Sequence, residues 1–262
     1  MTETISSFSN PIIKHARALH QKKVRDESQQ FLVEGILHVG EAVEANWDFE
    51  YLLYCEERLK SDFGRQLVAE LIKRDVRCQP VSAAAFESFS EKENPQGIAA
   101  VIHQKQRRLS ELQAFRFAVA IVAPQDPGNV GTILRTMDAV GADGLLLLDG
   151  GADPYHPSAV RASMGAIFWK PFYSATFADF VDWIKEINAR LIATSAHATV
   201  DYRKVELDNR PTILLLGSEQ KGLLPEQLAV CEEVLSLPME GRATSLNLAV
   251  AAGIFMYALK NA

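Results

Sequence analysis

Residues 213–259 constrain the fold most. They contain two short apolar runs, each followed by a polar loop, and then one long apolar segment. The run at 213–216 does not alternate, which favours a strand buried on both faces of a parallel sheet, although a buried helical turn has the same pattern. A second run at 234–237 leads to a helix expected over 246–259, with Ser245 as its N-cap. Because that helix is apolar almost all round, we expect it to be buried.

Small and polar residues fill the loops after both expected strands. The first loop reads Gly-Ser-Glu-Gln-Lys-Gly-Leu at 217–223, and the second reads Leu-Pro-Met-Glu-Gly-Arg-Ala-Thr-Ser-Leu-Asn at 237–247. Open parallel α/β sheets place ligands at the carboxyl ends of their strands. Both loops are therefore candidate ligand loops.

These two loops carry a resemblance to a known family. Gly-Ser-Glu-x-x-Gly-Leu at 217–223, and Leu-Pro-Met-x-Gly-x-x-x-Ser-Leu-Asn-x-x-x-Ala-Ala at 237–252, resemble the second and third motifs of SpoU-type RNA 2′-O-ribose methyltransferases of the SPOUT superfamily. The first motif of that family, Asn-x-Gly-x-x-x-Arg, is matched at 129–135. Three motifs in the family's order are far more specific than any single glycine pattern.

The resemblance implies S-adenosylmethionine as cofactor, held by three loops that are tied into a deep trefoil knot. It assigns cofactor contacts to Thr194, Ser195, Ala196, Leu216, Gly217, Ser218, Glu219, Leu237, Pro238, Met239, Ser245, Leu246 and Asn247. It implies a catalytic group made of Asn129, Arg135, Glu219, Ser245 and Asn247. Arg135 matches the arginine near the ribose hydroxyl, but a pKa above about 12 favours positioning of phosphate or ribose over proton acceptance.

Structural roles remain open for the same residues. Glu219 could cap the following turn, Asn247 could bond backbone groups inside the core, and Arg135 could be a surface ion-pair residue. Gln220 departs from the family, which usually has glycine there, and a positive φ at this position would strain or reshape the loop. The competing class is therefore a non-catalytic RNA-binding protein that keeps the fold.

Two other enzyme classes are disfavoured. Ser195, His197 and Asp201 suggest a hydrolase, but they lack a nucleophile elbow and any distinctive spacing. A dinucleotide-binding domain is weakly supported, because Gly128-Asn-Val-Gly131 is not the G-x-G-x-x-G pattern.

The length of 262 residues favours two domains. Alternating strand and helix patterns predict a small α/β domain over 1–104, a polar linker over 105–115 and a helix-covered, mostly parallel sheet over 116–262. The first domain resembles the substrate-binding domain of many SpoU-type enzymes, similar to kink-turn-binding ribosomal proteins, on the segments Phe31–Gly35 and Asn94–Ile98. For Glu34 and Gly97 we favour structural roles over RNA contact.

The RNA contacts are expected near the amino terminus. A net charge of −6 argues against a protein that coats nucleic acid indiscriminately, so binding requires a local basic patch. Between Thr4 and Arg25 the chain has no acidic residue, and its basic residues there are Lys14, Arg17, Lys22, Lys23 and Arg25. A solvated helix face has the same pattern. The ribosomal-protein-like first domain favours ribosomal over transfer RNA as substrate.

Composition sets the remaining expectations. Cys55, Cys78 and Cys231 are scattered without metal-ligand spacing, so no metal is expected. The start lacks a signal-peptide pattern and no apolar run is long enough to span a bilayer, so we expect a cytoplasmic protein without membrane contact. The resemblance implies a homodimer, and the apolar last helix has more surface than a small domain readily hides.

Overall fold

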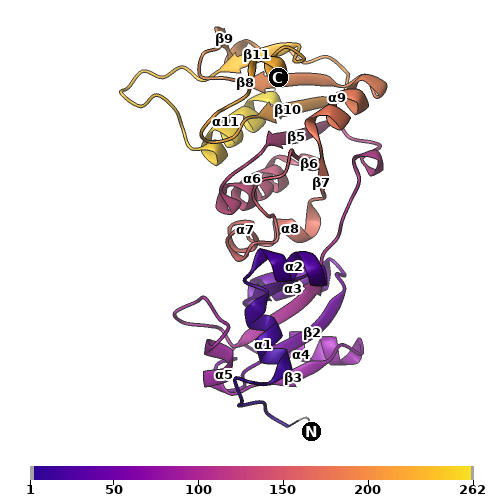
Figure 1. The fold of residues 1–262 in the computed structure, drawn as a ribbon, viewed down its shortest axis with the longest axis vertical. Helices are drawn as coiled ribbons and strands as arrows, with labels where there is room; N and C mark the ends of the chain where they lie inside the picture. Colours follow the sequence, from indigo (N-terminus) through magenta and orange to yellow (C-terminus); the bar gives the residue numbers. More distant parts are fainter. Residues whose placement is uncertain (1–2, 261–262) are drawn as a thin grey trace. The chain divides into compact units, whose positions relative to one another are not determined.

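A computed structural model describes residues 3–260, so the outermost residues of the expected domains, 1–2 and 261–262, lie outside it (Figure 1). The chain forms two compact units. The first comprises Met1–Lys105 and Tyr155–Phe168, and the second comprises Gln106–Pro154 and Trp169–Ala262. The segment Tyr155–Phe168 therefore packs with residues far from it in the sequence, whereas the sequence patterns suggested two continuous domains.

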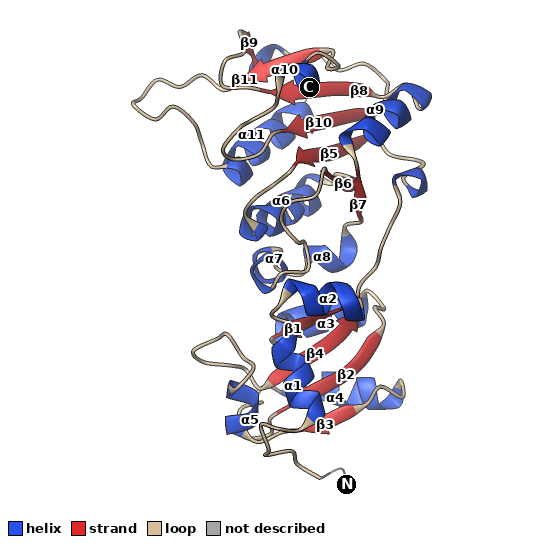
Figure 2. Cartoon of the chain, viewed as in Figure 1, coloured by secondary structure: helices blue, strands red, loops and turns tan. Residues whose placement is uncertain are grey.

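The first unit contains a four-stranded sheet in the order β1-β4-β2-β3 (Figure 2). Its strands are β1 (Gln30–Glu34), β2 (Phe49–Tyr54), β3 (Cys78–Pro80) and β4 (Ile98–His103). Only the β2–β3 pairing is parallel among the pairings of this sheet. The helices between Pro11 and Glu87 are α1 (Pro11–Ala18), α2 (Lys22–Ser28), α3 (Ile36–Glu44), α4 (Asp62–Lys73) and α5 (Ala83–Glu87). The expected α/β alternation is confirmed.

Local capping explains where several of these helices begin. Asn10 Oδ1 accepts the amide hydrogen of Ile12 at 3.0 Å, and Ser82 Oγ accepts that of Ala85 at 3.2 Å, so these two side chains cap the starts of α1 and α5. Glu34 Oε1 accepts a hydrogen bond from Ser90 Oγ at 2.6 Å, and the N-cap residue of α3 is a glycine, which has no side chain to cap the helix. Gly97 has φ +74° and a Cβ there would lie 2.8 Å from a backbone nitrogen, so backbone geometry requires a glycine.

An aromatic cluster explains why Tyr155–Phe168 belongs to the first unit. The ring of Phe31 lies 4.6 Å from that of Tyr155, and the ring of Trp47 lies 5.3 Å from that of Phe168. Trp47 Nε1 also donates a hydrogen bond to the carbonyl of Phe168 at 2.9 Å. This buried contact carries α7 (Pro157–Ala162) and most of α8 (Ala166–Trp169). The helical turn of α8 buries Phe168 in this contact.

The expected basic face is only partly correct. Lys14, Arg17, Lys22 and Lys23 are exposed, whereas Arg25 is 1% exposed and donates hydrogen bonds to the carbonyls of Leu19 and His20 at 2.7 and 2.9 Å. Arg25 therefore fastens the turn between α1 and α2, and its inclusion among the RNA-contacting residues was wrong. Arg17 donates to the carbonyl and hydroxyl oxygens of Ser88 at 3.0 and 2.8 Å.

Replacement of Arg25 with alanine should lower the free energy of unfolding by about 2–3 kcal/mol, because two carbonyl groups lose their donor and a buried space is left. The matched change Lys22→Ala on the exposed side of α2 should alter it by less than about 0.5 kcal/mol. Urea denaturation followed by circular dichroism checks both variants. Equal stability of the two proteins would show that Arg25 has no structural role.

The second unit is built on a seven-stranded sheet in the order β7-β6-β5-β10-β8-β11-β9, and every pairing in it is parallel. Its strands are β5 (Phe117–Val122), β6 (Gly144–Leu148), β7 (Phe172–Ala175), β8 (Arg190–Thr194), β9 (Val200–Asp201), β10 (Thr212–Leu216) and β11 (Glu233–Ser236). The expected parallel sheet is confirmed. The two-residue strand β9 was not expected, because so short an edge strand leaves no pattern.

Helices cover both faces of this sheet. The helical segments are η1 (Leu109–Glu111), α6 (Pro127–Val140), α9 (Phe177–Glu186), η2 (Tyr202–Lys204), α10 (Pro225–Leu228) and α11 (Leu248–Lys260). On one face, Phe180 and Ile184 of α9 pack in a core with Ala118 and Ile213 of the central strands. On the other face α6 and α11 lie side by side (Figure 2). Within residues 3–260, none of the helices combines the length and apolarity needed to cross a bilayer.

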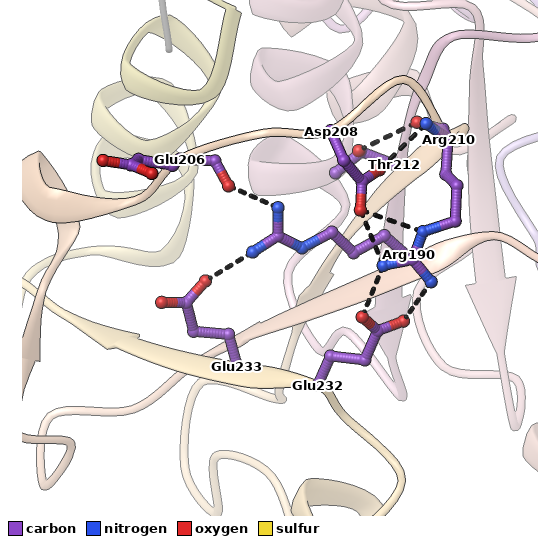
Figure 3. Close-up of polar contacts among 7 residues, drawn as sticks. All are labelled: Arg190, Glu206, Asp208, Arg210, Thr212, Glu232 and Glu233. Carbon is purple, nitrogen blue, oxygen red and sulfur yellow. Dashed lines mark hydrogen bonds and ion pairs between the residues drawn. The ribbon is translucent and has the colours of Figure 1, made fainter.

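A cluster of charged side chains lies at the amino-terminal ends of strands β8, β10 and β11 (Figure 3). Arg190 Nη2 lies 2.9 Å from Glu233 Oε2 and its Nη1 donates to the carbonyl of Glu206. Arg210 donates to Glu232 at 2.6 and 2.8 Å and to Asp208. The cluster fastens the segment before β10 across two neighbouring strands. It lies at the opposite strand ends from the two motif loops and is therefore structural.

Candidate active site

A cavity of about 780 Å³ lies at the carboxyl ends of β8, β10 and β11. Its lining comes from three loops and the start of α11. The lining residues are Thr194, Ser195, Ala196, His197, Leu216, Gly217, Ser218, Glu219, Gln220, Lys221, Gly222, Leu223, Leu237, Met239, Thr244, Ser245, Leu246, Asn247, Leu248, Ala251 and Phe255. The structure thus brings together the cofactor residues named from the sequence, apart from Pro238, which is exposed and lies outside this lining.

The loop after β10 is a tight turn. Gly222 N donates to the carbonyl of Ser218 at 2.9 Å, and Lys221 N donates to Ser218 Oγ at 3.3 Å. A Cβ on Gly217 would lie 2.1 Å from the carbonyl carbon of Gly222, so glycine is required where the turn folds back. Gly222 has φ +64°, which glycine adopts without strain.

Gln220 does not strain this turn. Among the described residues, the non-glycine positions with positive φ do not include it, and the left-handed residue of the turn is Gly222. The side chain of Gln220 is exposed at the cavity. The departure from the family's usual glycine therefore leaves the turn intact, and the reason for suspecting a non-catalytic protein is removed.

Side chains of all three motifs form one hydrogen-bonded chain. Glu219 accepts hydrogen bonds from Asn129 Nδ2 at 2.9 Å and from the backbone amides of Gln125 and Asp126 at 2.9 and 3.2 Å. Asn129 Oδ1 accepts from Asn247 Nδ2 at 2.9 Å. Residues up to 118 positions apart in sequence are thus connected directly. This chain lies beside the cavity, because Glu219 and Asn247 both line it.

The carboxyl group of Glu219 stays ionised at neutral pH. Its partial burial alone would raise its pKa, but hydrogen bonds from Asn129 and from the amides of Gln125 and Asp126 outweigh that effect and lower the pKa below its usual value. These bonds stabilise the folded state above the unfolded pKa, and the stabilisation is lost as pH falls through the lowered folded pKa. Through its bonds from Asn129 and from the amides of Gln125 and Asp126, Glu219 holds the start of α6.

The last helix begins later than expected. Asn247 Oδ1 accepts the amide hydrogens of Ala249 and Val250 at 2.9 and 3.3 Å, so Asn247 caps α11. Ser245 is exposed, two residues before this cap, and the expectation that it caps the helix was wrong. Asn247 is held at the cap position because its Nδ2 also donates a hydrogen bond to Asn129 Oδ1 at 2.9 Å. Ser245 and Leu246 line the cavity instead.

Arg135 lies apart from the cofactor residues. It is exposed on α6, the helix that begins beside Glu219, and within residues 3–260 its guanidinium makes no hydrogen bond or ion pair. The surface ion-pair role considered for it is therefore not seen. Six positions before it on the same helix, Asn129 is 7% exposed and held between Glu219 and Asn247. The structure thus joins Asn129 to the residues that line the cavity and leaves Arg135 exposed outside that lining.

Several cavity residues were not selected from the sequence. His197 follows the expected contact Ala196 directly, and Lys221 occupies a variable position inside the second motif, so their places next to motif residues were the available signals. Phe255 reaches the cavity from the middle of α11, and no sequence pattern singled it out. Over residues 3–260, no group of three or more His, Cys, Asp or Glu side chains is placed to hold a metal ion.

Comparisons with known proteins agree with the motifs. The pattern of the SpoU rRNA Methylase family matches residues 116–257, and that of the MRM3-like substrate binding domain matches residues 10–100. A 23S rRNA (guanosine(2553)-2′-O)-methyltransferase, RlmP, of Bacillus subtilis is 33% identical over 98% of this chain and 98% of its own length. A 23S rRNA (uridine(2479)-2′-O)-methyltransferase of Streptomyces viridochromogenes is 31% identical over 91% of this chain and 85% of its own.

Solved structures lead to the same assignment. An rRNA methyltransferase from Sinorhizobium meliloti, bound to S-adenosylmethionine, is 34% identical with a TM-score of 0.90, over 99% of this chain and 98% of that one. The SpoU methyltransferase AviRb from Streptomyces viridochromogenes, in complex with the same cofactor, is 30% identical with a TM-score of 0.84, over 96% of this chain and 97% of that one. Over both units of its fold and all three of its motifs, this chain belongs to the SpoU rRNA methylase family.

Proposed function

We propose that the chain transfers a methyl group from S-adenosylmethionine to a ribose 2′-hydroxyl of ribosomal RNA. As a member of its family it is an S-adenosylmethionine-dependent RNA 2′-O-ribose methyltransferase. The observation that carries the proposal is the hydrogen-bonded chain Glu219–Asn129–Asn247, which joins all three motifs beside one cavity.

The cavity fits the cofactor. Its volume of about 780 Å³ lies in the range of about 300–1,000 Å³ typical of small-molecule sites. Leu216, Leu237, Met239 and Phe255 give apolar surface suited to an adenine ring, and backbone groups of three loops give donors and acceptors for the ribose. When bound, the cofactor supplies an electrophilic methyl group on a positive sulfur. No side chain has to form a covalent bond to it.

The residues of this chain would promote the reaction by positioning the cofactor and the RNA. Methyl transfer is an in-line displacement, whose rate depends on alignment of the attacking oxygen with the methyl carbon. Asn247 fixes the start of α11 along one side of the cavity, and Glu219 fixes the start of α6. Arg135, exposed and without a partner among the described residues, would bind phosphate or ribose of the RNA. The proposed sites thus divide into a cofactor side and an RNA side.

The first unit would bind the RNA. Residues 10–100 match a substrate-binding domain, and Lys14, Lys22 and Lys23 are exposed there. The two 23S rRNA relatives are named for a guanosine and a uridine, so their names do not specify one nucleotide for this chain.

Labelled methyl groups provide the test of the function. Purified protein and labelled S-adenosylmethionine are incubated with ribosomal RNA from a strain in which the gene is deleted. We expect incorporation at one ribose, absent with RNA from the parent strain, because there the site is already methylated. Label on a base, or none in ribosomal RNA, would contradict the proposal.

We also propose that the chain is a homodimer through the exposed side of α11. Ala252, Phe255 and Met256 turn into the unit, whereas Val250 and Tyr257 are each 52% exposed, so the expectation of an all-round buried helix was wrong for the single chain. The exposed side is a shallow groove lined by Asn129, Thr132, Tyr202, Asn247, Ala249, Val250, Gly253, Ile254, Tyr257 and Ala258. A second copy would cover this apolar surface. The deep trefoil knot implied by the family's motifs is likewise part of the proposal.

Sedimentation checks the dimer. The wild-type protein should have twice the 29.0 kDa mass of the chain, and Val250→Asp should raise the dissociation constant at least about tenfold, because a charge would be buried at the contact. Ile72→Asp is the matched control, since Ile72 is 54% exposed on α4 in the other unit. A wild-type mass of one chain at every concentration would contradict the dimer.

A further inference from the structure

Two side chains at the cavity, His197 and Lys221, take no part in the hydrogen-bonded chain of the motifs. Both residues are exposed and line the cavity. Their backbone amides are engaged, but within residues 3–260 neither side chain makes a hydrogen bond or ion pair. The imidazole and the ammonium group therefore hold unused N–H donors at the cofactor site.

The two residues approach the cavity from neighbouring strands. Strand β10 pairs in parallel with β8, with Leu215 opposite Ala193, so the loops that follow these strands begin side by side. His197 N donates to Ser195 Oγ at 3.2 Å, and Lys221 N donates to Ser218 Oγ at 3.3 Å. Each backbone is thus fixed by a small turn, which limits the positions that the side chain can reach.

The charge of the cavity wall indicates which part of the cofactor Lys221 and His197 would contact. The ionisable side chains in the lining are His197, Lys221 and Glu219, and the carboxylate of Glu219 is bound by the amides of Gln125 and Asp126 and by Asn129. Lys221 is therefore the cationic side chain of the cavity wall. An ammonium group attracts a carboxylate and repels a positive sulfur. S-adenosylmethionine carries one carboxylate, at the end of its amino acid chain.

We propose that Lys221 and His197 bind the carboxylate of the cofactor's amino acid chain and thereby fix the end of the cavity at which that chain lies. The inference rests on the proposed function. Because both side chains are exposed, Lys221 should contribute about fivefold in affinity, the upper range for a solvent-exposed pair. The sulfur would then be kept away from the Lys221 ammonium.

Two ligands separate this contact from the rest of the site. S-adenosylhomocysteine keeps the amino acid chain, whereas 5′-methylthioadenosine lacks it and has the same adenosine. Calorimetric titration of the full chain with both ligands should show that Lys221→Gln weakens S-adenosylhomocysteine about fivefold and leaves methylthioadenosine unchanged. In the double variant Lys221→Gln/His197→Ala, the affinity for S-adenosylhomocysteine should fall further relative to the affinity for methylthioadenosine. Lys204→Gln, an exposed lysine outside the cavity lining, is the matched control and should resemble the wild type.

The outcomes are distinct. Retained methylthioadenosine binding shows that a variant is folded. An unchanged ratio of the two affinities in Lys221→Gln overturns the inference, whether both ligands weaken or neither does, and leaves the proposed function standing. Failure of the wild-type protein to bind S-adenosylhomocysteine overturns the proposed function and the inference together.

Discussion

Replacement of Arg135 with alanine should lower the rate of methyl transfer by about 10²- to 10³-fold while the affinity for S-adenosylmethionine stays nearly unchanged. Arg135 is exposed on α6, outside the cavity lining, and has no partner among the described residues. Its loss removes a group that aligns the RNA, and misalignment by about 1 Å can cost about 10²-fold in rate. Single-turnover methylation and calorimetric titration with the cofactor measure the two quantities separately.

Asn247→Ala provides the contrast. Asn247 caps α11, donates to Asn129 at 2.9 Å and lines the cavity. Loss of a cap costs about 1 kcal/mol of helix stability. Because this cap orders the start of α11 at the cavity wall, cofactor binding would have to restore that order, so cofactor affinity should fall about fivefold together with the rate. Lys185→Ala, an exposed residue on α9, is the control for both measurements and should have no effect. Equal loss of cofactor affinity in the Arg135 and Asn247 variants would show that the division into an RNA side and a cofactor side is wrong.

Neutralising Lys14, Lys22 and Lys23 together with glutamine should weaken RNA binding by about 10²-fold at 0.1 M salt. Each lost phosphate contact reduces the magnitude of the slope of log affinity against log salt by about 0.7–0.9, so three contacts change it by about 2 to 3. These residues are exposed on α1 and α2, whereas Arg17 is held by Ser88. Filter binding of ribosomal RNA at several salt concentrations measures the slope.

The matched control changes the net charge equally on another surface of the same unit. Lys60, Arg65 and Lys73 are exposed at or near α4, and their triple replacement with glutamine should leave the slope nearly unchanged. Cofactor affinity should be the same in both triple variants, because the cavity lies in the second unit. If the two triple variants lose RNA affinity equally, the residues on α1 and α2 form only a solvated helix face and the RNA is held elsewhere.

The sequence determined the ligand loops and the parallel sheet. The run 213–216 does not alternate, which is typical of strands covered on both faces, and it forms the central strand β10. The motif residues at 217–219 and 245–247 were placed at one cavity because carboxyl ends of parallel strands share an edge. Sequence patterns reached this far because they report local conformation and burial.

The tertiary structure decided what each polar residue contacts. Arg25 belongs to a basic run, yet burial at the α1–α2 turn makes it a structural residue. Ser245 and Asn247 are both residue types that cap helices, but only Asn247 also reaches Asn129. Tyr155 and Phe168 belong to the first unit because their rings pack against those of Phe31 and Trp47, which are distant in sequence. In each case the partner lies in another turn, strand or helix, and no local pattern records which distant groups folding will bring within hydrogen-bond or van der Waals distance.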